Sequence, residues 1–212
     1  PPASLYAARA GELAGDPRCG ARPAPAPARV MIDFGGPNVA KPMHVGHLRS
    51  SVIGDSLQRL LRFRGHQVVS DIHLGDWGLQ MGHLITELED EQPNLPYFDP
   101  AATGPYPETP PVDIDDLSRL YPQASAKAKE DAARLERSRR ATAELQSGRP
   151  GYRALLDHFI QVSIAALKSD FDALGVHFDL WKGESDVNDL IPELVDDFKA
   201  RAVAELSDGA WI

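Results

Sequence analysis

The chain has 212 residues, of which 42% are hydrophobic and 25% charged, and its formal net charge is -9 at pH 7. This length and composition are typical of a globular protein with one full domain, or with one domain and a small insertion. They argue against a membrane protein, because no apolar run approaches the roughly 20 residues of a spanning helix. The acidic balance also argues against a surface whose main task is binding nucleic acid.

Residues 1–29 are predicted to be a linker. A short helical pattern covers about residues 4–13, and alternating alanine and proline over residues 21–27 favour an extended polyproline geometry that buries no core. The single cysteine, Cys19, lies in this stretch and permits no internal disulfide. Since no signal-peptide pattern precedes the first predicted strand, we expect a cytoplasmic protein.

A strand is predicted over residues 30–34, where two glycines and a proline end it, and a helix is predicted from Val45 to Gly65. Apolar residues recur along this helix with the period expected of one buried face. They are Val45, Leu48, Val52, Ile53, Leu57, Leu60 and Leu61. We therefore expect these side chains to pack inward.

Two histidines, His44 and His47, fall in the first turn of this helix, three residues apart and on one side of its axis. A helix start carries unpaired N–H groups and the positive end of the dipole, which favour phosphate, and imidazoles can donate hydrogen bonds to phosphate oxygens. Gly46 leaves room for close approach to the backbone, and Lys41 adds a mobile cation. The arrangement suits a nucleotide.

The alternatives for the histidine pair are a zinc site and two incidental histidines at a helix start. Zinc would need two more ligands, and the other candidates, Cys19, His73 and His83, show no matching motif. Lys41 alone is equally compatible with an ordinary exposed lysine. From the residues alone, the arrangement suits a nucleotide, and these alternatives stay open.

A second strand is predicted over residues 67–72, which makes a strand–helix–strand unit with parallel strands. Ligands bind beyond the carboxyl ends of such strands, where the histidines and the turn over residues 75–78 are both expected. Asp76 and Trp77 either shape that turn or take part in the site. The next helix is predicted over residues 78–89, with Met81, Leu84, Ile85 and Leu88 facing inward.

Residues 90–150 are predicted to be an insertion. Residues 90–118 are rich in proline and acidic residues and contain no lysine or arginine, so we expect an irregular loop without core elements. Asp113, Asp115 and Asp116 either bind a cation or mark the start of the next helix, and we favour the helix start. A polar helix is predicted over residues 125–146.

Residues 151–212 return to the main domain. The helix predicted over residues 152–174 has a core face of Leu156, Phe159, Ile160, Leu167, Phe171 and Leu174. His158 lies beside that face, and we assign it a structural role. A third strand over residues 178–181 brings Glu184 to the same sheet edge, a helix follows over about residues 189–206, and a strand begins at Trp211.

The run His44-Val45-Gly46-His47 matches the His-x-Gly-His signature of class I aminoacyl-tRNA synthetases and related nucleotidyltransferases. The longer run over residues 37–50, together with residues 74–78 and 182–185, resembles the arginyl-tRNA synthetase family. The resemblance implies an α/β fold, a Rossmann-like parallel sheet with a helical and irregular insertion. Residues 30–89 and 151–212 would belong to the first half of the catalytic domain, with further domains before the linker and after Ile212.

The same resemblance implies a ligase that activates arginine with ATP and transfers it to the 3′ end of its tRNA. His44, His47 and Lys41 would stabilise phosphate charge as catalytic residues, and His44, Gly46 and His47 would bind ATP. Mg²⁺ would be carried on the phosphates, and no side chain is assigned to a metal.

For arginine, the resemblance implies contact of Asn38 with the backbone groups of the amino acid and of Glu184 with its guanidinium group. A planar carboxylate suits a guanidinium group and discriminates against lysine. Asp33 aligns with an acidic substrate-site position, although its place in an apolar strand fits a structural role almost as well.

Two other functions remain open. One is a His-x-Gly-His nucleotidyltransferase that acts on a small molecule without tRNA, against which Glu184 and the run over residues 37–50 argue. The other is a binding scaffold, because a later Lys-Met-Ser-Lys-Ser loop and a helical anticodon-binding domain are not in this sequence. We therefore expect the isolated chain to show negligible aminoacylation.

Overall fold

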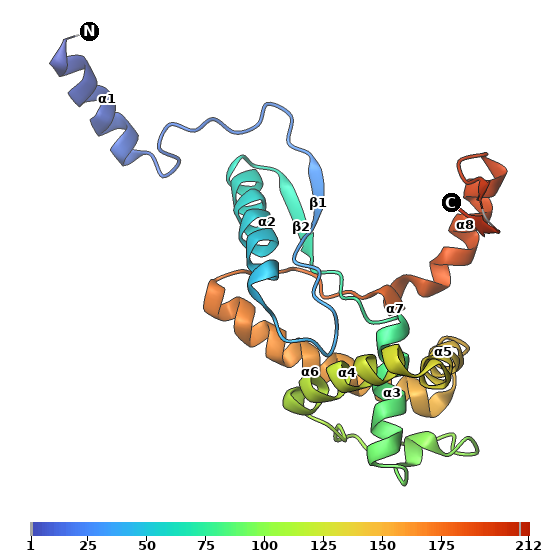
Figure 1. The fold of residues 1–212 in the computed structure, drawn as a ribbon. Coiled ribbons are helices and arrows are strands. Elements are labelled where there is room, and N and C mark those ends of the chain that lie inside the picture. The colour runs from blue at the N-terminus through green and yellow to red at the C-terminus, as the bar shows by residue number, and fades with distance from the viewer. Residues whose placement is uncertain (1, 208) are drawn as a thin grey trace. The chain divides into compact units, whose positions relative to one another are not determined.

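A computed structural model describes residues 2–207 and 209–212 of the chain (Figure 1). These residues divide into two compact units, each assembled from separate segments. Unit 1 takes in residues 2–36, 44–72 and 171–181. Unit 2 takes in residues 37–43, 73–170, 182–207 and 209–212.

Unit 1 contains the predicted strand–helix–strand element (Figure 1). This element consists of β1 (Arg29–Asp33), α2 (Val45–Phe63) and β2 (Gln67–Asp71), and α1 (Ala3–Gly15) precedes it in the chain. The strands pair in parallel, with Arg29 opposite Gln67 and Asp33 opposite Asp71. The predicted order and strand direction are confirmed, because a parallel pair needs a crossover such as α2.

The predicted third strand is reduced to a single parallel bridge between Leu180 and Asp71. The Leu180 N–H donates to the Ser70 carbonyl oxygen at 2.9 Å. The neighbouring Asp179 carboxylate accepts from the Ser70 N–H at 2.8 Å and from the Ser70 hydroxyl at 3.1 Å. The Asp179 side chain therefore takes the Ser70 N–H, which a longer backbone ladder between these strands would use. The prediction of a full strand over residues 178–181 is wrong.

The buried face of α2 is also different from the predicted one. Unit 1 buries Ser51, Gly54, Asp55 and Gln58, whereas Val45, Val52, Ile53, Leu57 and Leu60 are exposed. Gly54 faces the Phe34 ring, which occupies the space that a Cβ atom would need. The Gln58 amide donates to the His177 carbonyl oxygen at 2.7 Å. Within this unit, a glycine contact and polar pairing decide which side of the helix packs.

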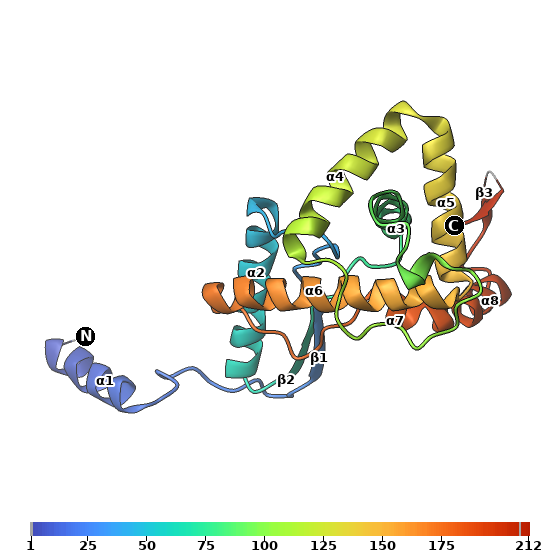
Figure 2. The same cartoon turned by 90° about the horizontal axis from the view of Figure 1, so that it is seen from below.

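Unit 2 is built around α3 (Leu79–Glu91), against which α4 (Ile114–Glu130) and α5 (Ala132–Gln146) pack, as Figure 2 shows with α3 seen end-on. The four predicted core residues of α3, Met81, Leu84, Ile85 and Leu88, are fully buried. Each such side chain contributes about 1.5–3 kcal/mol to folding. The predicted core face of α6 (Pro150–Leu174) is confirmed at Leu156, Phe159, Leu167 and Phe171, but Leu174 is exposed.

The region predicted as a coreless loop contributes to this core, so that prediction is wrong. Tyr97 and Phe98 in η1 (Pro96–Phe98) are buried, and α4 begins at Ile114. Asp113 caps α4 by accepting from the Asp116 N–H at 2.9 Å, which confirms the helix-start reading of the acidic cluster. Asp131 then ends α4 and caps α5, so two helices replace the single one predicted over residues 125–146.

The C-terminal segment is α7 (Glu184–Val187), η2 (Asn188–Leu190) and α8 (Ile191–Ala200), followed by an antiparallel hairpin of β3 (Leu206–Ser207) and β4 (Ala210–Trp211). The helix predicted to reach Leu206 therefore ends at Ala200. Two residues later, Ala202 has a positive φ of 53°, which is incompatible with a right-handed helix. None of the described helices combines the length and the apolar run needed to cross a bilayer.

Candidate functional site

The two imidazole rings at the start of α2 stack on each other in unit 1. The His44 and His47 ring centroids lie 4.0 Å apart, with 22° between the ring planes. His44 is the N-cap residue of α2, and its Nδ1 accepts from the Gly46 N–H at 3.1 Å. The His44 N–H donates to His47 Nδ1 at 3.3 Å. The two side chains therefore satisfy N–H groups at the helix start that have no partner within the helix.

These hydrogen bonds fix the tautomer of both neutral rings. Because Nδ1 of His44 and Nδ1 of His47 both accept from backbone N–H groups, each neutral ring carries its hydrogen on Nε2. Each ring then has an N–H donor on the edge away from the cap. No acidic residue lies in the first turn of α2, so the helix start keeps its preference for an anion.

Gly46 is required by the His44 ring itself. A Cβ atom on Gly46 would lie 2.8 Å from Cε1 and 2.9 Å from Nδ1 of His44. Such distances are shorter than van der Waals contact, so a larger residue would displace the imidazole. The glycine therefore lets the ring sit against the backbone of the first turn.

Asn38 lies against Gly75 in unit 2. The two residues form a parallel bridge in which the Val39 N–H donates to the Gly75 carbonyl oxygen at 3.0 Å. The Asn38 amide oxygen occupies the space that a Cβ atom on Gly75 would need. Residue 75 must therefore be glycine for Asn38 to keep this position.

Lys41 follows a strained residue in unit 2. Ala40 has a φ of 64°, in the left-handed region, and its N–H donates to the buried Ser163 hydroxyl at 2.9 Å. The Lys41 Nζ lies 4.5 Å from the centroid of the Tyr121 ring on α4. This cation–π contact holds the ammonium group on the helical part of unit 2.

Glu184 begins α7 and contacts the turn that contains Trp77. The Glu184 N–H donates to the Leu74 carbonyl oxygen at 3.1 Å, and the Glu184 Oε2 accepts from the Trp77 N–H at 3.3 Å. Asn38 and Glu184 thus both contact the segment over residues 74–77. They border the same turn, and their assignment to one substrate stays a prediction.

Trp77 contacts several other residues in this part of unit 2. Its indole N–H donates to the Asn188 amide oxygen at 2.9 Å, and its carbonyl oxygen accepts from the Gln146 amide at 2.8 Å. The Arg153 guanidinium lies 4.4 Å from the centroid of the indole ring. A pocket of about 430 Å³ lies beside the ring and has Trp77, Gln146, Glu184 and Asn188 in its wall.

Asp76 lies under the Glu184 loop. The Ser185 N–H donates to the Asp76 carboxylate at 2.8 Å and the Ser185 hydroxyl donates at 2.5 Å. Burial raises the pKa of Asp76 above its ordinary value of 3.8, and the nearby carboxylates of Glu184 and Asp186 act in the same direction. The Ser185 hydrogen bonds oppose this rise, so the loop is held by a carboxylate that is costly to ionise.

The sequence-predicted residues fall into two groups. His44, Gly46 and His47 contact one another in unit 1, where Asp33 is an exposed residue at the carboxyl end of β1. In unit 2, Asn38 and Glu184 border one turn, while Lys41 contacts Tyr121. That all of these residues meet at one sheet edge stays a prediction.

Within residues 2–207 and 209–212, no three or more His, Cys, Asp or Glu side chains are grouped so as to hold a metal ion. His158 is buried, and its Nε2 lies 2.9 Å from the Tyr97 hydroxyl and 3.0 Å from the Pro107 carbonyl oxygen. These contacts agree with the structural role assigned to it.

The family model described as "tRNA synthetases class I (R), catalytic domain" matches residues 19–212. The chain belongs to this family. The stacked histidines of the His-x-Gly-His motif, at the start of α2, thus lie in a class I (R) synthetase catalytic domain.

Curated relatives of this synthetase family match closely. An arginine–tRNA ligase from Maricaulis maris is 76% identical over all of this chain and over 36% of its own length. One from Hyphomonas neptunium is 69% identical over 99% of this chain and 36% of its own length. The chain therefore spans about a third of the length of the relatives that it matches.

Solved structures agree on the fold. An arginyl-tRNA synthetase from Plasmodium falciparum matches with a TM-score of 0.68 and 27% identity, covering 86% of this chain and 29% of its own. The synthetase from Thermus thermophilus matches with a TM-score of 0.63 over 92% of this chain and 29% of its own, and at 21% identity it supports the fold alone. The predicted α/β, Rossmann-like class is confirmed.

The resemblance to this synthetase family rests on short motifs. It does not predict the contacts of residues outside those motifs. Trp77 stood in a recognised segment, but its role was left open. The contacts of Gln146 and Asn188 with Trp77 were not predicted. Neither the polar helix that contains Gln146 nor the segment after Glu184 has a pattern that indicates contact with so distant a residue. Tyr121 was missed for the same reason.

Proposed function

We propose that the protein to which these residues belong is an arginine–tRNA ligase, and that this chain supplies part of its catalytic site. In the proposed reaction a carboxylate oxygen of arginine attacks the α-phosphorus of ATP. The bond to the bridging oxygen breaks, and arginyl-adenylate and pyrophosphate form. A ribose hydroxyl at the 3′ end of the tRNA then takes the arginyl group and releases AMP.

The observation that carries this proposal is the histidine pair. Two stacked imidazoles whose Nδ1 atoms accept at an anion-favouring helix start can donate from Nε2 to phosphate oxygens as charge develops during transfer. His44, Gly46 and His47 would contact ATP in this way. Lys41 would add a positive charge to the same phosphates after leaving the Tyr121 face.

The turn over residues 74–77 supports arginine as the second substrate. Glu184 would accept the guanidinium group, and the pocket of about 430 Å³ beside Trp77 is large enough for an amino-acid side chain. Asn38 would hydrogen-bond the amino or carboxyl group of arginine. Asp33 would add a carboxylate, which its exposed place at the end of β1 permits.

Mg²⁺ would neutralise part of the charge on the phosphates of ATP. It would be carried on these phosphates, as Mg²⁺ usually is in sites that bind nucleotides. The tRNA for arginine would be the third substrate, and the cytoplasm the place of action. Residues 1–29 would be a linker, and residues 90–150 an insertion into the catalytic domain at residues 30–89 and 151–212.

The experiment is ATP–pyrophosphate exchange by the full-length gene product, measured with and without arginine and tRNA. Exchange that depends on arginine, together with charging of the tRNA, supports the proposal. Exchange that ignores arginine would indicate the alternative, a small-molecule nucleotidyltransferase. The isolated 212-residue chain should show negligible charging, and robust charging by it would contradict that expectation.

A further inference from the structure

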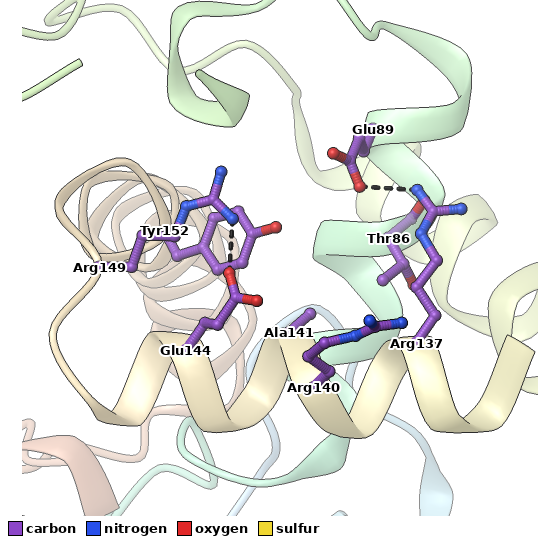
Figure 3. Close-up of a pocket in the computed structure, with 8 residues that line it drawn as sticks. All are labelled: Thr86, Glu89, Arg137, Arg140, Ala141, Glu144, Arg149 and Tyr152. Carbon is purple, nitrogen blue, oxygen red and sulfur yellow. Dashed lines mark hydrogen bonds and ion pairs between the residues drawn. The ribbon is translucent and has the colours of Figure 1, made fainter. Parts of the chain in front are cut away.

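Unit 2 contains another pocket, of about 250 Å³, between α3, α5 and the start of α6 (Figure 3). Its wall has none of the residues assigned to ATP or arginine. Three arginines, two glutamates and a tyrosine supply its polar groups: Arg137, Arg140, Arg149, Glu89, Glu144 and Tyr152.

One arginine of this pocket has no acidic partner. Arg137 pairs with Glu89 at 2.6 Å and with Asp90 at 2.5 Å, and Arg149 pairs with Glu144 at 2.6 Å. Arg140 is exposed on α5, and among the described residues it has no hydrogen-bond or ion-pair partner. One guanidinium group of the pocket is therefore uncompensated, in a chain with a net charge of -9.

Tyr152 supplies a second donor without a partner. The residue is only 4% exposed, and its ring lies under the Arg149 guanidinium at 3.9 Å. Its hydroxyl points toward the middle of the pocket in Figure 3, and within the described part of the chain it makes no hydrogen bond. Burial raises the pKa of Tyr152, so the hydroxyl stays protonated and can donate. The hydroxyl is therefore a donor that an oxygen atom of a ligand can accept from.

The two unpartnered groups define the ligand. Both donate, so they require oxygen acceptors, and the uncompensated guanidinium adds a preference for negative charge. A tetrahedral phosphate has enough oxygens to accept from both groups at once. The volume of about 250 Å³ lies below the usual range for sites that enclose drug-sized ligands, so a single phosphate suits it better than a whole nucleotide.

We propose that this pocket binds one phosphate group, with Arg140 and Tyr152 as its donors. Arg137 and Arg149, both paired with carboxylates, line the pocket beside these donors. Two sources share this chemistry: a backbone phosphate of RNA, and a free phosphate or phosphomonoester. The experiment below separates them.

The test is titration of the 212-residue chain with inorganic phosphate, followed by the amide resonances of α5 and α6. Arg140→Gln and Tyr152→Phe should each weaken binding about tenfold, because each removes one hydrogen bond to a charged ligand. Arg139→Gln is the matched control. Arg139 is the adjacent arginine of α5, is exposed, pairs with Glu136 at 3.6 Å and does not line the pocket. It should change the affinity less than twofold.

Tyr152→Phe keeps the ring and its contact with Arg149, so a folded variant is expected, and circular dichroism checks it. Equal weakening by Arg139→Gln and Arg140→Gln would overturn the proposal, because the effect would then be that of net charge. Binding that is unaltered in both pocket variants would overturn it as well.

A short RNA hairpin distinguishes the sources. If an RNA phosphate occupies the pocket, the hairpin displaces inorganic phosphate, and Arg140→Gln lowers the slope of log affinity against log salt by about one. If the ligand is free phosphate, the hairpin leaves phosphate binding unchanged. Both results support a phosphate site and assign its source.

Discussion

The His44 N–H donates to Nδ1 of His47 at 3.3 Å, while the two rings stack with their centroids 4.0 Å apart. One histidine thus orients the other, and both use Nδ1 for the backbone of α2. Nε2 is the other nitrogen of each ring, and it is the atom with which each ring is proposed to meet a phosphate. The cap and the proposed catalytic role therefore use different atoms of the same rings.

This separation can be tested with His44→Asn and His44→Ala. Asparagine is a good N-cap, so His44→Asn should keep the free energy of unfolding within a few tenths of a kcal/mol, whereas His44→Ala should lose about 1 kcal/mol. Both remove the Nε2 donor and should slow adenylate formation about a hundredfold. Urea unfolding and ATP–pyrophosphate exchange measure the two effects. If His44→Asn retained full exchange activity, the ring would act only as a cap.

Gly46→Ala tests the position of the His44 ring. The new Cβ atom would lie 2.8 Å from Cε1 of the imidazole, so the ring must move away from the helix start. We expect exchange to fall about tenfold or more while the KM for arginine stays the same. An unchanged rate would show that the observed ring position is not the active one.

Glu184→Gln tests the proposed guanidinium contact. The amide oxygen can still accept from the Trp77 N–H, but the negative charge is lost. The KM for arginine should rise about 10- to 100-fold, with little change in the KM for ATP. Asp189→Asn, an exposed acid in η2, makes the same change of charge as a control and should have little effect. Equal effects of the two variants would argue against a specific contact.

The sequence predicted helices better than their packing. Periodicity identified α2, but its apolar residues Ile53 and Leu57 are exposed in unit 1, because Gly54 receives the Phe34 ring on the other side. Periodicity also could not show that Asp131 interrupts the helix predicted over residues 125–146, since aspartate is tolerated within a polar helix and its role as a cap depends on local backbone geometry.

Asp76→Asn tests how burial affects a carboxylate under the Glu184 loop. Because burial raises the pKa of Asp76, the folded protein holds that proton more tightly than the unfolded chain. The linked stabilisation is complete below the unfolded value of 3.8 and is lost as the pH rises through the raised pKa. The unfolding free energy of the wild type, minus that of the variant, should therefore fall with rising pH and then level off. Urea titrations across this range measure it, and a difference that rises with pH would contradict the assigned direction.

Gly82→Ala tests the contact between α3 and α5. The Cβ atom would overlap the Ser138 carbonyl oxygen and the Thr142 hydroxyl, so the variant should lose about 1–3 kcal/mol of unfolding free energy. Gly11→Ala in α1 is the matched control, because no atom lies within 4 Å of its Cβ position. There, alanine should be neutral or stabilising by up to about 1 kcal/mol. Similar losses in both variants would show that the close helix contact is not the cause.

The candidate site was predictable where short motifs carry the chemistry, as at His44 and Glu184. The contacts of Trp77 with Gln146 and Asn188 were not, because they join residues that are far apart in the sequence and have no pattern of their own. Lys41 shows a third case. Its charge could be predicted, but its place over Tyr121 depends on the left-handed Ala40 and on the buried Ser163.

The most direct measurement is the ¹⁵N spectrum of the histidine side chains, recorded on the full-length gene product with and without ATP and Mg²⁺. The account predicts that His44 and His47 carry hydrogen on Nε2 and none on Nδ1, and that both Nε2 resonances shift when ATP binds. Hydrogen on Nδ1, or Nε2 resonances that ATP leaves unchanged, would contradict it.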